Sequence, residues 1–305
     1  MTNMTLFASV RGSVMMVFSG LLILSFLASI QPAIAANFQL KPHKDKLFKY
    51  RKAIKSEDNG RFVRAPYDPL RDINGRDEIP VRKVKTYYTS SRPRRHQQDL
   101  SFKANGRDVT YFGVGALNSF SNMTVIFVHG RDGSRHLGFS DEKFGGNFNR
   151  VKSLMYFNGG IYLSTDITDF KEKGRQDVAA LIKKYRANTK GPLVVACGSM
   201  GSHICWRLAN ARSSARMIDG LVIMGGFPND QFLATRRNKS ASKIPVYIAH
   251  GGIDYVYSWK DQMKFYLGLR KAGNPVRYVV FDGGKHGTPV RMIDWRFALN
   301  WIANN

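Results

Sequence analysis

The sequence predicts an α/β fold in which a doubly wound, mostly parallel sheet carries helices on both faces. Two observations from residue 101 onward lead to this fold class. Short β-rich runs alternate with amphipathic stretches, and several of the runs are continuously apolar. Strands buried on both faces read as unbroken apolar runs, and strands that alternate with helices form parallel sheets. Hydrophobic residues make up 43% of the 305 residues, which is enough for a sizeable core.

The expected elements follow one another in a regular order along the chain. The β-rich runs lie at 109–114, 124–129, 160–164, 193–197, 221–224, 246–250 and 276–281. Amphipathic periodicity predicts helices at 176–187, 201–211, 259–272 and 290–302. Gly191 and Gly273 stand near the ends of two of these helices, where a C-cap glycine belongs. We therefore place the main domain at residues 101–305.

The first 35 residues have the layout of a secretory signal peptide. Arg11 precedes an apolar run at 14–30, and Ala33-Ile34-Ala35 then forms a small-residue cleavage site. An uncleaved membrane anchor is the alternative, which an apolar run short of roughly 20 residues disfavours. We expect cleavage after Ala35 and an exported protein, either periplasmic or secreted.

Residues 36–100 form a polar and basic segment that prolines interrupt. The segment contains 17 lysines and arginines against 8 aspartates and glutamates, and its apolar periodicity is weak. We expect an irregular N-terminal extension with one short strand at 81–88, which either wraps the main domain or is partly disordered. The formal charge of the whole chain is +25 at pH 7, which favours anionic partners such as an anionic membrane or an acidic polysaccharide. General solubility is the alternative explanation, and in an exported protein we do not expect nucleic acid as a partner.

The most specific local pattern is Cys197-Gly198-Ser199-Met200-Gly201, where an apolar run ends and a helix begins. It resembles the G-x-S-x-G nucleophile elbow of the α/β-hydrolase superfamily, with cysteine in the first small position. In that superfamily a strained turn raises the serine above the C-terminal edge of the sheet. The resemblance therefore makes Ser199 the nucleophile. The alternative is a serine in an ordinary glycine-rich turn, such as a phosphate-binding loop.

The resemblance also orders the partners of Ser199, because in this superfamily the acid and then the histidine follow the serine along the chain. His286 lies in a glycine-rich loop after the last run, where the base is expected, whereas His203 falls inside the elbow helix and His250 ends a strand. Asp254 follows that strand in a loop similar to the acid loop of many carboxylesterases, so we expect it to orient His286. The positions of four other aspartates disfavour them as the acid: Asp166, Asp169, Asp282 and Asp294.

Two backbone N–H groups are needed to stabilise the oxyanion of an acyl-transfer intermediate. In the superfamily one of them belongs to the residue after the nucleophile, which is Met200 here. The run His129-Gly130-Arg131-Asp132-Gly133 follows an earlier strand and looks like the oxyanion loop of the superfamily, so Arg131 supplies the second N–H. A glycine-rich β-turn is the alternative.

The resemblance covers roughly residues 105–305, makes residues 101–305 the catalytic domain, and implies a carboxylesterase-like or lipase-like serine hydrolase. It implies two-step acyl transfer without a metal or an organic cofactor. Fewer than two dozen residues separate Gly226 from Ile244, too few for a large cap domain, so we expect an open site that suits envelope lipids or acylated polysaccharides. The alternatives are a peptidase, thioesterase or depolymerase with the same triad, and a non-catalytic basic binding protein on this scaffold.

Two further expectations concern the surroundings of the site. The segment 131–150 is long and glycine-rich, and we expect it to form a small lid. Candidate pocket walls are Phe144, Phe148 and Trp259, for each of which core packing is favoured, and candidate contacts for an anionic head group are Arg135, His136 and Lys143.

Cys197 and Cys205 are expected to be free buried thiols, because a short strand–turn–helix leaves the sulfurs little freedom to meet.

Overall fold

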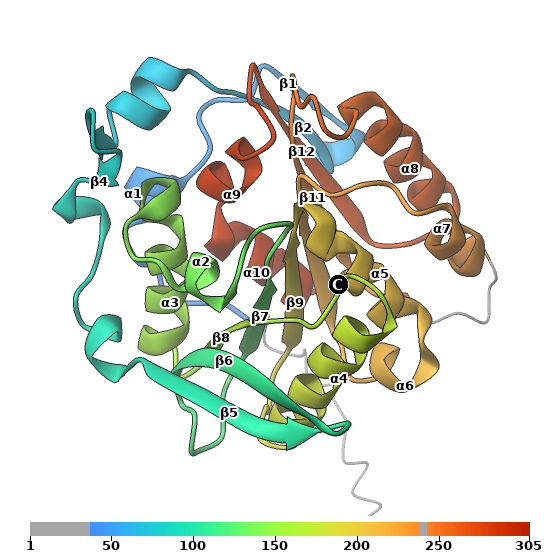
Figure 1. The fold of residues 1–305 in the computed structure, drawn as a ribbon. Coiled ribbons are helices and arrows are strands. Elements are labelled where there is room, and N and C mark those ends of the chain that lie inside the picture. Colours follow the sequence, from blue (N-terminus) through green and yellow to red (C-terminus); the bar gives the residue numbers. More distant parts are fainter. Residues whose placement is uncertain (1–36, 238–242) are drawn as a thin grey trace, which may run out of the picture. The chain divides into compact units, whose positions relative to one another are not determined.

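The computed structural model describes residues 37–237 and 243–305 (Figure 1). The predicted signal peptide, residues 1–35, lies outside the described residues. The described residues belong to one compact unit, Asn37–Asn305. No helix within them is long and apolar enough to span a membrane.

A ten-stranded sheet in the order β1-β2-β12-β11-β10-β9-β7-β8-β6-β5 forms the centre of this unit. From β2 to β8 in this order the neighbouring strands are parallel, whereas β1 is antiparallel to β2, and β6 is antiparallel to both β8 and β5. All seven predicted strands are present, and the mostly parallel sheet confirms the fold class. The strands are β1 (Lys55–Glu57), β2 (Phe62–Pro66), β5 (Gln98–Ala104), β6 (Arg107–Gly115), β7 (Thr124–Val128), β8 (Ile161–Thr165), β9 (Leu193–Gly198), β10 (Gly220–Met224), β11 (Val246–Gly251) and β12 (Val276–Asp282), and a separate pair is β3 (Asp77–Glu78) with β4 (Lys83–Val84).

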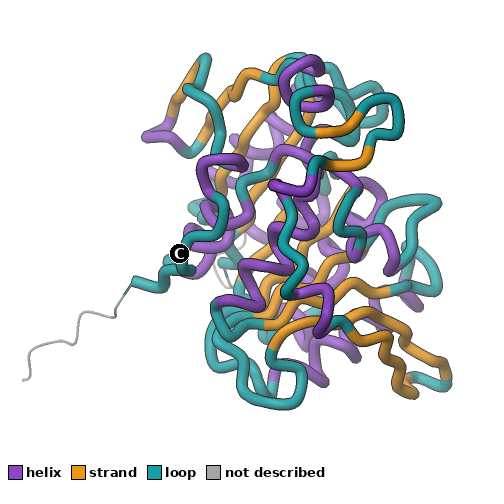
Figure 2. The backbone as a smooth tube through the Cα atoms, turned by 90° about the vertical axis from the view of Figure 1, so that its left-hand side faces the viewer, coloured by secondary structure: helices purple, strands orange, loops and turns teal. Residues whose placement is uncertain are grey.

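Helices cover both faces of the sheet (Figures 1 and 2). Successive side chains of a strand point to opposite faces. In β7, Ile126 and Val128 therefore join the apolar core under α4, α5 and α8, whereas Val125 and Phe127 join the core under α3 and α10. The helices are α1 (Asp45–Phe48), α2 (Arg135–Phe139), α3 (Asn147–Phe157), α4 (Glu172–Arg186), α5 (Ser202–Asn210), α6 (Arg212–Ala215), α7 (Asp230–Arg237), α8 (Trp259–Lys271), α9 (Thr288–Met292) and α10 (Trp295–Ala303).

Three of the four predicted helices are present as α4, α5 and α8. The helix predicted at 290–302 is two helices, because the Asp294 carboxylate accepts a hydrogen bond from Phe297 N and so caps the start of α10. The sequence analysis missed α3, which buries Arg150 and Lys152 together with its apolar residues. These buried cations obscure the apolar periodicity by which a helix is recognised.

The domain boundary predicted at residue 100 does not divide the structure. β1 and β2 extend the central sheet beside β12, with Val63 paired to Val279, so this segment is part of the same unit. At 81–88 the structure has the two-residue strand β4 and a 3₁₀ turn over Thr86–Tyr88, so the predicted strand is mostly wrong. The sequence pattern did not reveal β2 because this strand is short and its partner lies at the other end of the chain.

Charged side chains attach residues 37–100 to the rest of the unit. Three acidic residues of this basic segment, Asp45, Asp58 and Asp77, meet arginines that are distant in sequence. The side chains of Arg150 and Asp77 are 0% exposed, so two of these ion pairs reach into the interior. The pairs are Asp45 with Arg150 and Arg296, Asp58 with Arg270, and Asp77 with Arg291; Arg64 in turn pairs with Asp282 of β12.

Candidate active site

The turn after β9 holds Ser199 in a strained backbone conformation. Ser199 has a φ of 49°, in the left-handed region that residues with a side chain rarely adopt. A Cβ atom added to Gly201 would lie 2.6 Å from His129 O, and one added to Gly130 would lie 2.8 Å from Ser199 Cβ. The small residues of the pattern are therefore required, because the elbow packs directly against the turn after β7.

The turn brings Ser199 to His286, the predicted base. Ser199 Oγ lies 2.8 Å from His286 Nε2, and His286 Nδ1 lies 2.8 Å from Asp254 Oδ2. An ionised carboxylate only accepts hydrogen bonds, so the imidazole carries its proton on Nδ1 and Nε2 accepts from the serine hydroxyl. The three residues come from three loops at the C-terminal ends of β9, β11 and β12. In this arrangement the imidazole is oriented to take a proton from the serine as the serine attacks an electrophile.

The Asp254 carboxylate is held by several donors in a solvent-free position. Its side chain is 0% exposed, and Oδ1 accepts hydrogen bonds from Val256 N (2.8 Å) and Tyr257 N (3.1 Å). Burial alone would raise the pKa of Asp254, but the hydrogen bonds from His286, Val256 and Tyr257 outweigh it and lower the pKa below its ordinary value. Asp254 is therefore ionised at neutral pH.

His250 lies against the acid loop and does not contact Ser199. Its buried Nε2 is 2.9 Å from Tyr257 O and 3.3 Å from Asp254 Oδ2. Burial lowers the pKa of His250, which keeps this imidazole neutral. His250 therefore fastens the backbone that carries Asp254.

The other candidate acids and bases are engaged elsewhere in the described structure. His203 stacks on Phe227, with ring centres 3.9 Å apart. The four aspartates have partners of their own: Asp166 binds Arg135 and Thr110, Asp169 accepts from Lys171 N and Gly174 N, Asp282 pairs with Arg64, and Asp294 caps α10.

Comparison with solved structures finds esterases with this arrangement of strands and helices. A thermostable esterase is similar with a TM-score of 0.53 and 15% identity over 68% of this chain, which spans 62% of that protein, less than two thirds of its length. The Pyrococcus furiosus esterase Pf2001 is similar with a TM-score of 0.50 and 16% identity, over 68% of this chain and 91% of that one. This chain has the α/β-hydrolase fold. No protein-family model matches the sequence, and no curated protein matches it.

The two predicted oxyanion donors of this α/β-hydrolase fold are neighbours in space. Arg131 Nε lies 3.1 Å from Met200 Sδ, next to Ser199. Among the described residues the Arg131 N–H has no hydrogen-bond acceptor. Arg131 and Met200 remain the predicted pair of donors.

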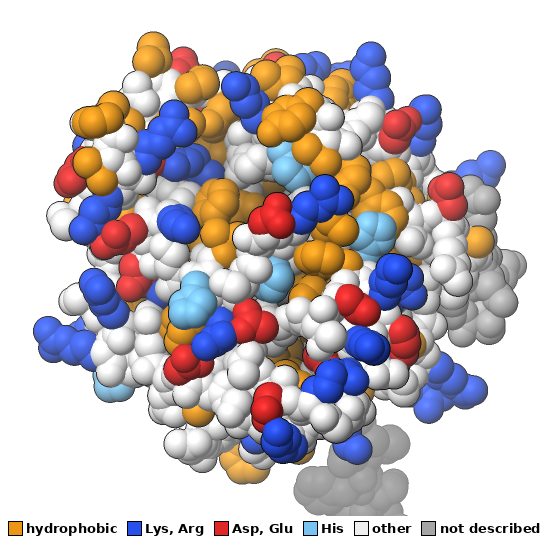
Figure 3. All heavy atoms as spheres, in the orientation of Figure 1, with side chains coloured by type: hydrophobic (Ala, Val, Ile, Leu, Met, Phe, Trp, Pro, Cys, Tyr) orange, Lys and Arg blue, Asp and Glu red, His pale blue; other side chains and the backbone are white. Residues whose placement is uncertain are grey.

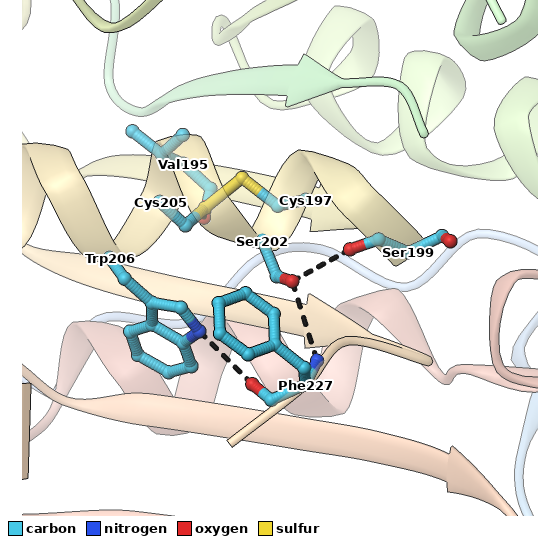
Figure 4. Close-up of a disulfide and its surroundings, with 7 residues drawn as sticks. All are labelled: Val195, Cys197, Ser199, Ser202, Cys205, Trp206 and Phe227. Carbon is cyan, nitrogen blue, oxygen red and sulfur yellow. Dashed lines mark hydrogen bonds between the residues drawn. A yellow bond between two sulfur atoms is a disulfide. The ribbon is translucent and has the colours of Figure 1, made fainter. Parts of the chain in front are cut away.

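The prediction of two free thiols is wrong. Cys197 and Cys205 form a disulfide, with their Cα atoms 6.3 Å apart (Figure 4). The elbow is tight enough for α5 to turn back over β9, which places Cys205 above Cys197 within the distance that a disulfide spans. The short connection between β9 and α5 therefore favours the disulfide instead of preventing it. As a result, Cys197, in the first small position of the elbow, is covalently linked to the elbow helix.

Hydrogen bonds around the disulfide connect the elbow to the segment after β10 (Figure 4). Ser202 Oγ donates to Ser199 O (2.7 Å) and accepts from Phe227 N (3.4 Å), while Trp206 Nε1 donates to Phe227 O (3.1 Å). These bonds thereby fasten the backbone that carries Ser199 to the segment after β10.

The segment 131–150 is not the free lid that its glycines suggested. It contains α2, a 3₁₀ turn over Lys143–Gly146 and the start of α3, and Phe148 is buried in the core. Arg135 is bound by Asp99 and Asp166, so it is not available to a ligand. Of the predicted pocket walls, Phe144 lies by the triad, where its ring would be 3.7 Å from a Cβ on Gly287. Trp259 is partly buried and packs against the apolar core under α4, α5 and α8.

Aromatic side chains that the sequence analysis did not single out lie next to the triad. The ring of Tyr257 is 5.7 Å from that of His286, and the ring of Phe227 is 6.1 Å from that of Tyr257. Both residues follow the ends of parallel strands, the position at which site residues gather in such sheets. Figure 3 shows hydrophobic side chains around a hollow in the middle of the face that is turned to the viewer, near the start of α5.

Residues 37–237 and 243–305 contain no group of three or more side chains that could hold a metal ion.

Proposed function

We propose that the protein is a serine hydrolase that cleaves carboxylic esters, with Ser199 as nucleophile, His286 as base and Asp254 as acid. The observation that carries this proposal is the continuous pair of 2.8 Å hydrogen bonds from Ser199 through His286 to the buried Asp254. The strained φ of Ser199 supports it, since strain of this kind is retained where a turn must present a reactive side chain.

The reaction proceeds in two acyl-transfer steps. His286 Nε2 takes the hydroxyl proton as Ser199 Oγ attacks the ester carbonyl carbon, and the N–H groups of Arg131 and Met200 stabilise the oxyanion. The intermediate collapses when His286 returns the proton to the leaving alcohol, which leaves an acyl group on Ser199. Water then attacks the acyl carbon with His286 again as base, and the carboxylic acid departs.

The proposed substrate is an ester that binds at an open, apolar site, and the protein is proposed to be exported. The aromatic rings of Tyr257 and Phe227 beside His286 suit an acyl chain, and the two solved structures described above are esterases by name. Export is supported by the leader-like residues 1–35 and by the disulfide, a bond that persists in oxidising compartments. We propose envelope lipids or acylated polysaccharides as the substrate class.

A fluorophosphonate probe followed by mass spectrometry tests the nucleophile. We expect one covalent adduct, located on Ser199 by fragmentation and absent in Ser199→Ala. Ser213→Ala, which removes an exposed serine beyond the elbow helix, is the matched control and should keep the adduct. A well-folded protein that takes no label would contradict the proposal and favour a non-catalytic binding protein.

A substrate panel then separates the ester hydrolase from the alternatives. Nitrophenyl esters of increasing chain length, a peptide anilide and a thioester are compared by kcat/KM. We expect the oxygen esters to be preferred. A higher kcat/KM for the anilide or the thioester would retain the triad but change the reaction class.

A further inference from the structure

A small, mainly cationic cavity lies between the N-terminal segment and α9, and no triad residue lines it. Its volume is about 60 Å³. Five cations and one carboxylate contribute to its wall, and the remaining side chains are apolar or aromatic. The charged wall consists of Lys46, Lys49, Arg51, Arg71, Arg76 and Asp72, and the other side chains are Leu47, Phe48, Tyr88 and Met292.

Arg76 is the buried cation of this cavity. It is 5% exposed, its guanidinium lies 4.8 Å from the ring centre of Phe48 and 5.2 Å from that of Tyr88, and Nη2 donates to Gly145 O (2.8 Å). Its Nε is buried and has no acceptor, and no carboxylate in the described part of the chain is within ion-pair distance. A buried guanidinium without a counter-charge is unfavourable, so these features point to an anion that would complete its environment.

The exposed cations of the cavity also lack counter-charges. Within residues 37–237 and 243–305, no carboxylate lies within ion-pair distance of Lys46, Lys49 or Arg51. Asp72 is already engaged, since Arg71 Nε donates to its Oδ1 at 2.9 Å. The positive charges around the cavity therefore repel one another unless an anion binds between them.

We propose that this cavity binds a phosphate group. Its volume is that of a few water molecules, which accommodates one tetrahedral oxyanion but excludes a sugar or a nucleobase. Guanidinium groups match phosphate oxygens in geometry and charge, and several converging cations suit a dianion better than a single carboxylate. The phosphate group comes either from inorganic phosphate or from the headgroup of a membrane phospholipid.

Isothermal titration calorimetry of the purified protein with inorganic phosphate, at constant ionic strength, tests the site. We expect saturable binding of one phosphate, weakened at least about tenfold in the double variant Lys49→Gln/Arg51→Gln. Both side chains are exposed, so the variant should fold, and circular dichroism checks this. The matched control Lys260→Gln/Lys271→Gln removes the same charge from exposed positions on α8 and should bind as the wild type does.

Vesicles distinguish the two sources of the phosphate group. Phosphatidylcholine vesicles with and without phosphatidic acid, whose headgroup is a phosphate monoester, are sedimented with the protein. Binding that requires phosphatidic acid, is displaced by inorganic phosphate and is lost in Lys49→Gln/Arg51→Gln would assign the site to a lipid headgroup. Phosphate binding without vesicle binding would assign it to the free anion. No saturable binding in either assay, or an equal loss in both double variants, would overturn the proposal.

Discussion

Residues 37–100 and residues 101–305 contribute strands to the same sheet, but charges have a larger part in holding the earlier region. The later region is held by side chains with essentially no exposure on both faces of parallel strands, such as Val125 and Ile126. The earlier region buries fewer apolar side chains, among them Phe62, and ion pairs such as Asp77–Arg291 also attach it to helices distant in sequence.

This difference decides what a sequence shows of each region. Apolar burial leaves a periodic trace in the sequence, because each strand or helix must repeat its buried positions. An ion pair leaves no such trace, since an aspartate that meets an arginine two hundred residues away has the same composition as a solvated one. A segment that is polar and basic is therefore not necessarily separate from the domain that follows it.

The largest expected effect concerns the proposed chemistry, whose triad residues all lie in the later region. Asp254→Asn should lower kcat about 10,000-fold with little loss of stability. The asparagine carbonyl would keep the hydrogen bonds from Val256 N and Tyr257 N and turn its amide toward His286. That arrangement moves the imidazole proton to Nε2, where it cannot accept from Ser199. A steady-state assay with a nitrophenyl ester and a urea unfolding curve check both parts, and a loss below tenfold would exclude Asp254 as the acid.

The next effect tests whether charges hold the earlier region as firmly as apolar packing holds the later one. Asp77→Asn leaves Arg291 without its carboxylate partner in a largely buried place, and should lower the free energy of unfolding by about 3 kcal/mol. Leu181→Ala, in the apolar core, should cost about the same. Urea unfolding measures both.

Glu57→Gln is the control for this pair of variants. Glu57 pairs with Lys55 on the surface, where both side chains are about half exposed, so its effect should stay below about 0.5 kcal/mol. If Asp77→Asn behaved like Glu57→Gln, the segment would be held by something other than its charges.

The disulfide adds a covalent constraint to the region that apolar burial already stabilises. Reduction should lower the free energy of unfolding by about 2 kcal/mol, because the bond closes a ring over a sequence separation of only 8 residues. Unfolding curves with and without a reducing agent measure the difference. Alkylation of the unreduced, unfolded protein should modify neither cysteine, and modification of both would restore the original expectation of free thiols.

The smallest effect is a pH dependence at the contact of the earlier region with α8. Hydrogen bonds from Arg270 and Tyr266 hold the pKa of Asp58 at about 2. A carboxylate whose pKa falls on folding contributes stability above its unfolded pKa of about 3.9 and loses it as the pH falls toward 2. After allowance for solvent screening, the stability advantage of the wild type over Asp58→Asn should shrink by about 1 kcal/mol between pH 5 and pH 2. An advantage that stays constant over this range would mean that the pair contributes no charge interaction.

The fold class and the seven strands from residue 109 onward were predictable, because several of these runs are unbroken and apolar and they alternate with amphipathic stretches. The residues that the structure brings together at Ser199 were also found, since each follows the end of a predicted strand. The disulfide was missed because its formation depends on how closely α5 turns back over β9. The helix α3 and the strand β2 were missed because one buries cations and the other finds its partner far along the chain.

The pairing of β2 with β12 has a consequence for the order in which the protein is made. The ribosome completes the β1–β2 pair long before β12 exists, so the other edge of β2 stays unpaired while most of the chain is still being synthesised. In the same interval the forming sheet has an open edge, which in other proteins is a site of pairing between chains. The ten-stranded sheet can therefore be completed only once β12, near the end of the chain, has been made.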